Sequence, residues 1–284
     1  MATQHAVPTH DDRALSVHDT GAPVLDAVTV VWHHGSPQTG ALLHPLVDAA
    51  EARGIRLVSY ARPSYATSSP RPGRDVASAA ADVEHIAETL GLDRFAVMGA
   101  SGGGPHALAC AALLPDRVTA AVTLAGLAPF TEEFDWFGGM ASDAALRAAR
   151  QGREARARFA ETDEFDPTSF TARDWATLDS TWSALGEDAQ AAEAAGPDGL
   201  IDDDVAFVSP WGFDPSTISA PVLLVHGGED RVVPVSHSRR LVETLPDAEL
   251  WFRPRDGHVS VLEAVPLAMD WLLAHGSGST GTAR

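Results

Sequence analysis

The chain has 284 residues, is 45% hydrophobic and carries a formal net charge of −19 at pH 7. This size suits one large α/β domain or a domain with an insertion, and a charge this negative argues against nucleic acid or an anionic membrane as partner. No apolar run is long enough to span a membrane and residues 1–13 lack the apolar core of a signal peptide, so a cytoplasmic protein is expected.

In chain order, strand-like and helix-like stretches alternate through the first half of the sequence. Residues 1–13 are expected to form a flexible polar tail before the core begins. Strands are expected at 27–32, 55–60, 94–98 and 118–124. Helices are expected at 43–53, 76–90 and 105–114. This alternation predicts an α/β fold with a mostly parallel, doubly wound sheet covered by helices on both faces.

The segment 130–215 interrupts the alternation. It holds 19 of the 39 acidic residues but only 6 of the 20 basic ones, and it contains no strand-like run. Helices are expected at 143–161, 172–185 and 187–195. Because parallel sheets bind ligands at the carboxyl ends of their strands, a helical insertion there is expected to form a cap over that edge.

After the insertion the alternation resumes. Strands are expected at 222–225 and 249–252, and helices at 236–245 and 261–273. The Gly/Ser/Thr-rich stretch 276–284 is expected to be a flexible tail. The predicted organisation is therefore a core made of 14–129 and 216–275, with the cap at 130–215.

A serine lies between a predicted strand and a predicted helix, in Gly99-Ala100-Ser101-Gly102-Gly103. A nucleophilic serine on such a turn needs small neighbours, and the following helix directs its N-terminal amides at the same place. The pattern alone also fits a structural glycine-rich turn. In its strand–turn–helix setting it predicts that Ser101 is a catalytic nucleophile.

A serine hydroxyl needs a base, and the base needs an acid that orients it. His258 follows the last predicted strand, and Asp230 follows the strand before it, with Glu229 as the local alternative acid. Because parallel strands end at one edge of the sheet, Ser101, Asp230 and His258 are expected to meet there.

The oxyanion of a tetrahedral intermediate needs two backbone N–H donors. Gly102 supplies the first by its position directly after the nucleophile. The second is expected from the loop after the first predicted strand, where Ser36 is the favoured donor, Gly35 is the competitor and Pro37 has no N–H to donate.

These residues make the sequence resemble the α/β-hydrolase superfamily. The matching stretches are 34–35, 99–103, 114–118, 226–234 and 257–258. The resemblance covers roughly residues 14–275 and implies the α/β-hydrolase fold, with nucleophile, acid and base at Ser101, Asp230 and His258. The superfamily includes esterases, lactonases, C–C bond hydrolases, aminopeptidases and cofactor-free haloperoxidases.

Two departures narrow the resemblance. Epoxide hydrolases and haloalkane dehalogenases use an aspartate nucleophile, whereas this chain has Ser101. Proline iminopeptidases usually show His-Gly-Gly-Pro-Gly, whereas this chain reads His-Gly-Ser-Pro-Gln at 34–38. Ester hydrolysis is therefore favoured over aminopeptidase activity.

The sequence thus predicts a serine hydrolase that cleaves a small ester or lactone through an acyl-enzyme on Ser101. We expect a small-molecule substrate, no cofactor and no metal, because no His/Asp/Glu spacing resembles a metal site. The expected substrate-binding residues are His34, Gly35, Leu127, Phe130, Trp136, Phe137, Trp182 and Val259. The alternatives are an aminopeptidase, C–C hydrolase or lyase that uses the same triad, or a receptor-like protein that binds its ligand without turnover.

Overall fold

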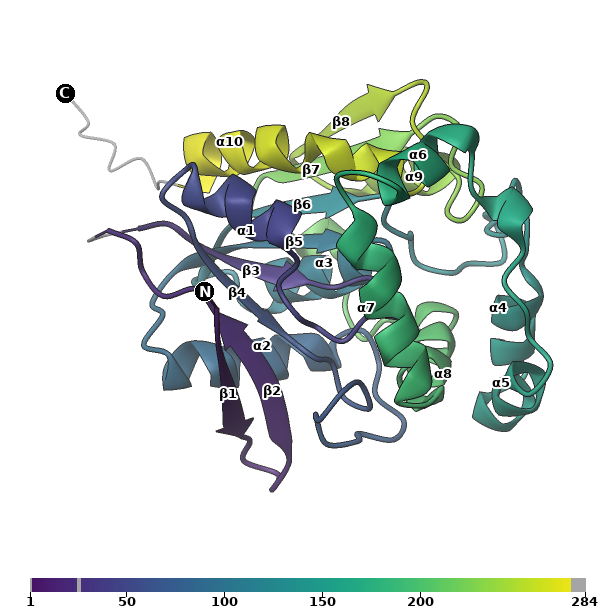
Figure 1. Ribbon diagram of the computed structural model, residues 1–284, viewed down its shortest axis with the longest axis horizontal. Coiled ribbons are helices and arrows are strands. Elements are labelled where there is room, and N and C mark those ends of the chain that lie inside the picture. Colours follow the sequence, from purple (N-terminus) through teal and green to yellow (C-terminus); the bar gives the residue numbers. More distant parts are fainter. Residues whose placement is uncertain (1, 25–26, 277–284) are drawn as a thin grey trace.

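One sheet with the strand order β1-β2-β4-β3-β5-β6-β7-β8 forms the centre of the computed structural model, which describes residues 2–24 and 27–276 (Figure 1). The strands are β1 (Thr3–Pro8), β2 (Ala14–Asp19), β3 (Thr29–His33), β4 (Arg56–Tyr60), β5 (Phe95–Ala100), β6 (Val118–Leu124), β7 (Val222–Gly227) and β8 (Ala248–Arg253). From β4 to β8 every neighbouring pair is parallel, whereas β1 and β2 are added antiparallel at one edge. The predicted mostly parallel, doubly wound sheet is confirmed.

The first strand corrects the prediction of a tail at residues 1–13. Thr3–Pro8 pairs with β2, and Thr3 lies opposite Asp19. Of the β1 side chains only Val7 is buried, so the segment lacks the hydrophobic alternation by which strands are usually recognised. Backbone hydrogen bonds to β2 hold it, and composition does not report such bonds.

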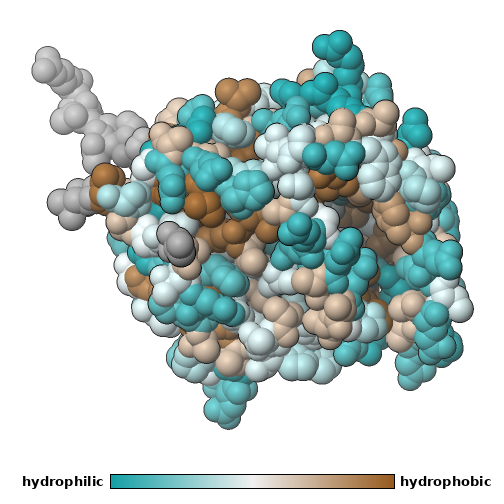
Figure 2. All heavy atoms as spheres, in the orientation of Figure 1, coloured by the Kyte–Doolittle hydropathy of each residue, from teal (hydrophilic) through white to brown (hydrophobic). Residues whose placement is uncertain are grey.

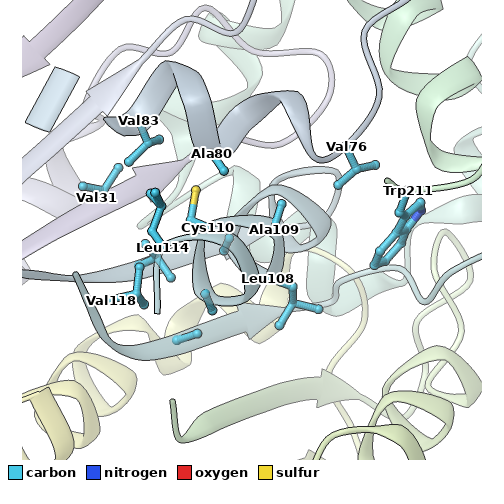
Figure 3. Packing of buried hydrophobic residues seen from close by; sticks show 14 of the residues in the cluster. Val31, Val76, Ala80, Val83, Leu108, Ala109, Cys110, Leu114, Val118 and Trp211 are labelled. Carbon is cyan, nitrogen blue, oxygen red and sulfur yellow. The ribbon is translucent and has the colours of Figure 1, made fainter. Parts of the chain in front are cut away.

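Helices cover both faces of this sheet. The core helices are α1 (His44–Glu51), α2 (Ser78–Thr89), α3 (Gly103–Leu113), α9 (Ser236–Thr244) and α10 (Val265–Gly276). Side chains of α1 and α10 belong to one hydrophobic cluster, and side chains of α2, α3 and α9 to the other. Figure 3 shows part of the cluster under α2, α3 and α9, where Val83 of α2 and Cys110 of α3 pack near Val31 of β3. Residues 277–284, predicted to be a flexible tail, lie outside the described residues.

Residues 130–215, all of which are described, contain helices and no strand. The helices are α4 (Ala144–Ala149), α5 (Arg153–Ala160), α6 (Ala172–Leu178), α7 (Ser183–Ala194) and α8 (Asp198–Phe207). The helix predicted at 143–161 is broken into two at Gly152, whose φ of +100° is a conformation that glycine adopts easily. Helix α8 was not predicted.

These five helices lie beyond the ends toward which the parallel strands run (Figure 1). Figure 2 shows that the surface is hollowed between α7 and the α4–α5 pair, whereas most of this face is hydrophilic. Among the described residues, no helix is long and apolar enough to cross a membrane.

Candidate active site

Ser101 occupies a strained turn between β5 and α3. Its φ is +51°, a region that costs a non-glycine residue about 1–3 kcal/mol. The turn is fixed by a hydrogen bond from the Ser101 N–H to the Leu124 carbonyl, at 2.8 Å. A Cβ atom on Gly99 would lie 2.3 Å from the Gly103 carbonyl oxygen, and one on Gly103 would lie 2.0 Å from the His33 carbonyl oxygen. The glycines of the motif are therefore required by backbone packing at the turn.

The structure brings the three predicted catalytic side chains together. Nε2 of His258 lies 2.9 Å from Ser101 Oγ, and Nδ1 of His258 lies 2.8 Å from Asp230 Oδ2. Asp230 directly follows the β7 strand and its turn, and His258 lies in the loop after β8. The neighbouring Glu229 is exposed, so the geometry distinguishes Asp230 from its local alternative.

Opposite influences set the charges of the acid and the base. Burial would raise the pKa of Asp230, but the charge of His258 and hydrogen bonds to His226 and His258 outweigh it and hold that pKa far below its usual range. The backbone N–H groups of Val232 and Val233 also donate to Asp230 Oδ1, each at 2.9 Å. Burial would lower the pKa of His258, but the Asp230 charge and hydrogen bond outweigh it and raise that pKa. The arrangement therefore favours an ionised Asp230 and a strengthened base.

In the loop after β3, the two candidate oxyanion donors Gly35 and Ser36 differ in whether their N–H groups are already hydrogen-bonded. The N–H of Gly35 is occupied, because it donates to Gln38 Oε1 at 2.5 Å. In the described part of the chain, the N–H groups of Ser36 and Gly102 donate to no protein acceptor. A Cβ atom on Gly102 would lie 2.4 Å from Ser36 Oγ, so the two donors predicted for the oxyanion are neighbours.

Asp203 of α8 was not predicted as a site residue. Its buried carboxylate bonds to the side chain of Ser36 in this loop. Its Oδ2 accepts hydrogen bonds from Ser36 Oγ at 2.5 Å, Arg62 Nη2 at 2.6 Å and the Tyr65 hydroxyl at 2.8 Å. Its Oδ1 pairs with Arg74 Nη2 at 2.7 Å. Burial would raise the pKa of Asp203, but the two guanidinium groups outweigh it and hold the pKa well below its usual range. The side chain of Ser36 is thus held by a buried ion cluster.

Several residues predicted to bind substrate are buried in the protein. Trp136 and Trp182 are only 1% and 2% exposed, and the Trp136 indole N–H donates to the Ala128 carbonyl at 2.8 Å. Leu127 and Val259 are also buried, one in each hydrophobic cluster. Both indoles pack in the protein interior, and their contact with substrate stays a prediction. The sequence could not distinguish the two roles, because aromatic residues fill cores and pockets alike.

Two further residues predicted to bind substrate, Gly35 and His34, lie in the loop after β3. Gly35 lies beside the serine, since a Cβ atom added to Gly35 would be 3.7 Å from Ser101 Cβ. His34 is buried, with Nδ1 bonded to the Gly35 carbonyl at 2.6 Å and Nε2 accepting from the Arg62 N–H at 3.1 Å. Both ring nitrogens of His34 are therefore occupied within the protein.

Phe130 and Phe137 form a half-buried aromatic pair with ring centroids 5.9 Å apart. Arginine side chains of α4 and its C-terminal end cover both rings. The Arg150 guanidinium lies 3.9 Å from the Phe130 centroid, and that of Arg147 lies 4.1 Å from the Phe137 centroid. Both rings therefore already have cationic partners.

One surface cluster has the donor set of a metal site, which sequence spacing did not predict. Ligand atoms of His10, His85 and Glu88 lie within 4.8 Å of one another. Imidazole nitrogens and a carboxylate oxygen suit Zn²⁺. The cluster joins the turn after β1 to α2 and includes no member of the Ser101 site, so it offers no ligand to the reacting atoms.

Comparisons with known proteins agree with this architecture. A family model described as alpha/beta hydrolase fold matches residues 28–265. A protein of Caulobacter sp. (strain K31), named as a candidate carbamate hydrolase (RutD), is 28% identical over 254 residues, covering 84% of this chain and 86% of that protein. A 2-hydroxy-6-oxononadienedioate/2-hydroxy-6-oxononatrienedioate hydrolase of Dechloromonas aromatica (strain RCB) is 28% identical over 264 residues, covering 87% and 85%.

A solved structure has the same fold. The crystal structure of a bromoperoxidase from Bacillus anthracis superposes with a TM-score of 0.73 and 23% sequence identity, covering 96% of this chain and 99% of that chain. At this identity the likeness concerns the arrangement of the sheet and helices.

Proposed function

The chain belongs to the α/β-hydrolase fold family, and from that premise we propose that it is a serine hydrolase that cleaves a small, uncharged ester or lactone. The observation that carries the proposal is the hydrogen-bonded series of Ser101 Oγ, the His258 imidazole and the Asp230 carboxylate, at 2.9 and 2.8 Å. A serine, a base and an orienting acid in this geometry are the parts that acyl transfer needs.

In the proposed reaction, His258 Nε2 takes the proton of Ser101 as Oγ attacks the substrate carbonyl carbon. The N–H groups of Ser36 and Gly102 stabilise the oxyanion, and the ionised Asp230 stabilises the imidazolium. The tetrahedral intermediate collapses, and His258 gives its proton to the leaving alkoxide. Water then attacks the acyl-enzyme with His258 as base, which releases the carboxylic acid and restores Ser101.

The arginines around the Ser36 loop support an uncharged substrate. Arg62 and Arg74 are both buried, and their guanidinium groups already bond to Asp203 and to the backbone carbonyls of residues 34, 35 and 199, so neither is presented to a substrate carboxylate. The Dechloromonas relative is named for a dienedioate, which carries two carboxylates. We therefore favour a neutral ester or lactone over a C–C bond hydrolase that acts on a diacid.

The helices of 130–215 would serve as the cap in this proposal. They lie beyond the carboxyl ends of the strands, where the serine is presented, and two of them contribute buried acids to the surroundings of the site. Acyl size would then be limited by the cap, as in other enzymes whose lids close over the reacting groups.

Replacement of Ser101 tests the function directly. Turnover of p-nitrophenyl acetate and p-nitrophenyl butyrate by Ser101→Ala is expected to fall at least about 10³-fold with no loss of thermal stability. The matched control is Ser142→Ala, since Ser142 is exposed in the loop before α4. Retained turnover in Ser101→Ala would sink the assignment. Stoichiometric labelling of Ser101 by an organophosphonate without ester turnover in the wild type would favour the receptor-like alternative.

A further inference from the structure

Asp174 of α6 is a fully buried carboxylate that uses its two oxygens on two different parts of the chain. Its Oδ2 accepts from the N–H and hydroxyl of Thr171, at 2.9 and 2.8 Å, and so caps its own helix. Its Oδ1 accepts from the N–H groups of Val259 and Ser260 and from Ser260 Oγ, at 2.9, 2.7 and 2.8 Å. A capping box requires only the first set of bonds.

The loop that carries His258 is built around this carboxylate. Gly257 precedes His258, and a Cβ atom there would lie 2.0 Å from Asp174 Oδ2. The Gly257 N–H donates to Ser260 Oγ at 2.8 Å, which closes the loop around the same group. Asp174 therefore contacts the backbone directly before and directly after His258, from a helix of the inserted segment.

Asp174 also contributes to the charge that His258 experiences. Burial lowers the pKa of His258, and the charges of Asp230 and then Asp174 act in the opposite direction. The other acid of the loop, Asp256, is paired with Arg173 and Arg253, so its charge is balanced locally.

We propose that Asp174 is a positioning residue for the catalytic base, which holds the backbone on both sides of His258 so that Nε2 stays within hydrogen-bond reach of Ser101. This inference rests on the proposed serine-hydrolase function. It ties α6 to the loop that carries the base through the bonds from Val259 and Ser260 to Asp174.

The decisive variant is Asp174→Asn, which keeps the size of the side chain but removes its charge and turns one acceptor into a donor. We expect kcat for p-nitrophenyl acetate to fall on the order of 10²-fold, as for other small misplacements of a catalytic group, with little change in KM. Because one negative charge near the imidazolium is lost, the acid limb of the kcat/KM profile is expected to move to lower pH.

Two further variants separate positioning from simple helix stability. Thr171→Val removes the hydroxyl of the capping box but keeps every bond from Asp174 to the loop, so it is expected to lower the melting temperature and leave kcat and the acid limb unchanged. Gly257→Ala keeps the charge but displaces the carboxylate, so kcat is expected to fall as in Asp174→Asn. If Asp174→Asn does not fold, Gly257→Ala carries the test.

The outcomes are distinguishable from failure of the function itself. If wild-type turnover does not depend on Ser101, both the function and the positioning role are overturned. If wild-type turnover depends on Ser101 while the folded Asp174→Asn and Gly257→Ala proteins keep the wild-type kcat and acid limb, only the positioning role is overturned. An equal loss of kcat in Thr171→Val would also overturn it, in favour of a purely structural role.

Discussion

His258 is subject to opposing effects of burial and charge. Its side chain is only 10% exposed, which favours the neutral imidazole, yet Asp230 bonds to Nδ1 and favours the imidazolium. The net effect raises the pKa of His258, so the group is a stronger base than an ordinary histidine. A stronger base suits proton removal from serine but remains protonated, and therefore inactive, to a higher pH.

This balance predicts the pH dependence of the enzyme. Proton removal requires neutral His258, so kcat/KM for a neutral ester should fall as pH drops through the His258 pKa. Because that pKa is raised, the midpoint of the acid limb is expected above 6.5, the ordinary value for histidine. A midpoint at or below 6.5 in profiles from pH 5 to 9 would contradict the proposed role of His258 as the base paired with Asp230. Asp230→Asn should move the midpoint downward.

Which single residues could be predicted depended on their position along the chain. Ser101, Asp230 and His258 each follow a predicted strand, so topology alone brought their expected positions to one edge. The three consecutive acids Asp202, Asp203 and Asp204 have the composition of a solvated surface, but all three are buried in α8. Their burial depends on arginines far away in the sequence, and one sequence contains no sign of that pairing.

At the scale of elements, the turn from β5 to α3 is packed too closely against its neighbours to accept a side chain at Gly102. A Cβ atom on Gly102, the residue at the start of α3, would meet both Ser36 Oγ at 2.4 Å and the Phe207 ring at 2.8 Å. The nucleophile turn, the loop after β3 and α8 are therefore packed against one another at this point. The geometry of one element cannot change without moving the others.

A methyl group at residue 102 is expected to displace the Ser36 loop and weaken oxyanion stabilisation. Gly102→Ala should lower kcat by about 10²–10³-fold, the loss typical of one oxyanion donor. Gly186 in α7 provides the control, because its Cβ atom would meet nothing within 4 Å. Gly186→Ala should keep kcat and raise the free energy of unfolding by about 0.5–1 kcal/mol. Equal kcat values for the two variants and the wild type would refute the proposed role of this contact.

Elements with regular hydrophobic patterns were predicted well, and those without them were not. The core helices and parallel strands alternate in a way that limits the possible folds, so their order could be predicted. The edge strand β1 buries only Val7, and α8 is apolar and acidic at once, so neither shows the period of its element. The formation of β1 and of α8 therefore depends on tertiary contacts.

At the scale of the whole molecule, the inserted segment is joined to the core by buried ion pairs. Asp203 of α8 contacts Arg62 and Arg74, which both follow β4 in the chain. Breaking one side of a buried pair is costly because it leaves an uncompensated charge. The insertion is therefore expected to unfold together with the sheet.

Adjacent acids of α8 offer a matched test of this coupling. Asp203→Asn leaves two buried arginines unpaired and should lower the free energy of unfolding at pH 7 by about 3–5 kcal/mol. Because the folded-state pKa of Asp203 is depressed, the wild-type contribution is complete above about pH 4 and is lost as pH falls further.

Asp204→Asn is the control, since burial raises the pKa of Asp204 to about 6 despite its contact with Arg156. An acid with a raised folded-state pKa contributes less stability as pH rises through that value, so Asp204→Asn should cost less at pH 7 than Asp203→Asn. Denaturant unfolding of both variants measures this difference. Equal losses at pH 7 would contradict the larger stabilisation expected from the Asp203 cluster.

The sequence separation of the proposed nucleophile and its base has a consequence during synthesis. Ser101 and His258 are 157 positions apart, so at roughly 5–20 residues per second the ribosome polymerises the base roughly 8–30 s after the serine. During that interval the nascent chain contains Ser101 but lacks the proposed general base. Chains that terminate before residue 258 would have no His258 to activate the serine, so the proposed hydrolysis requires translation past that residue.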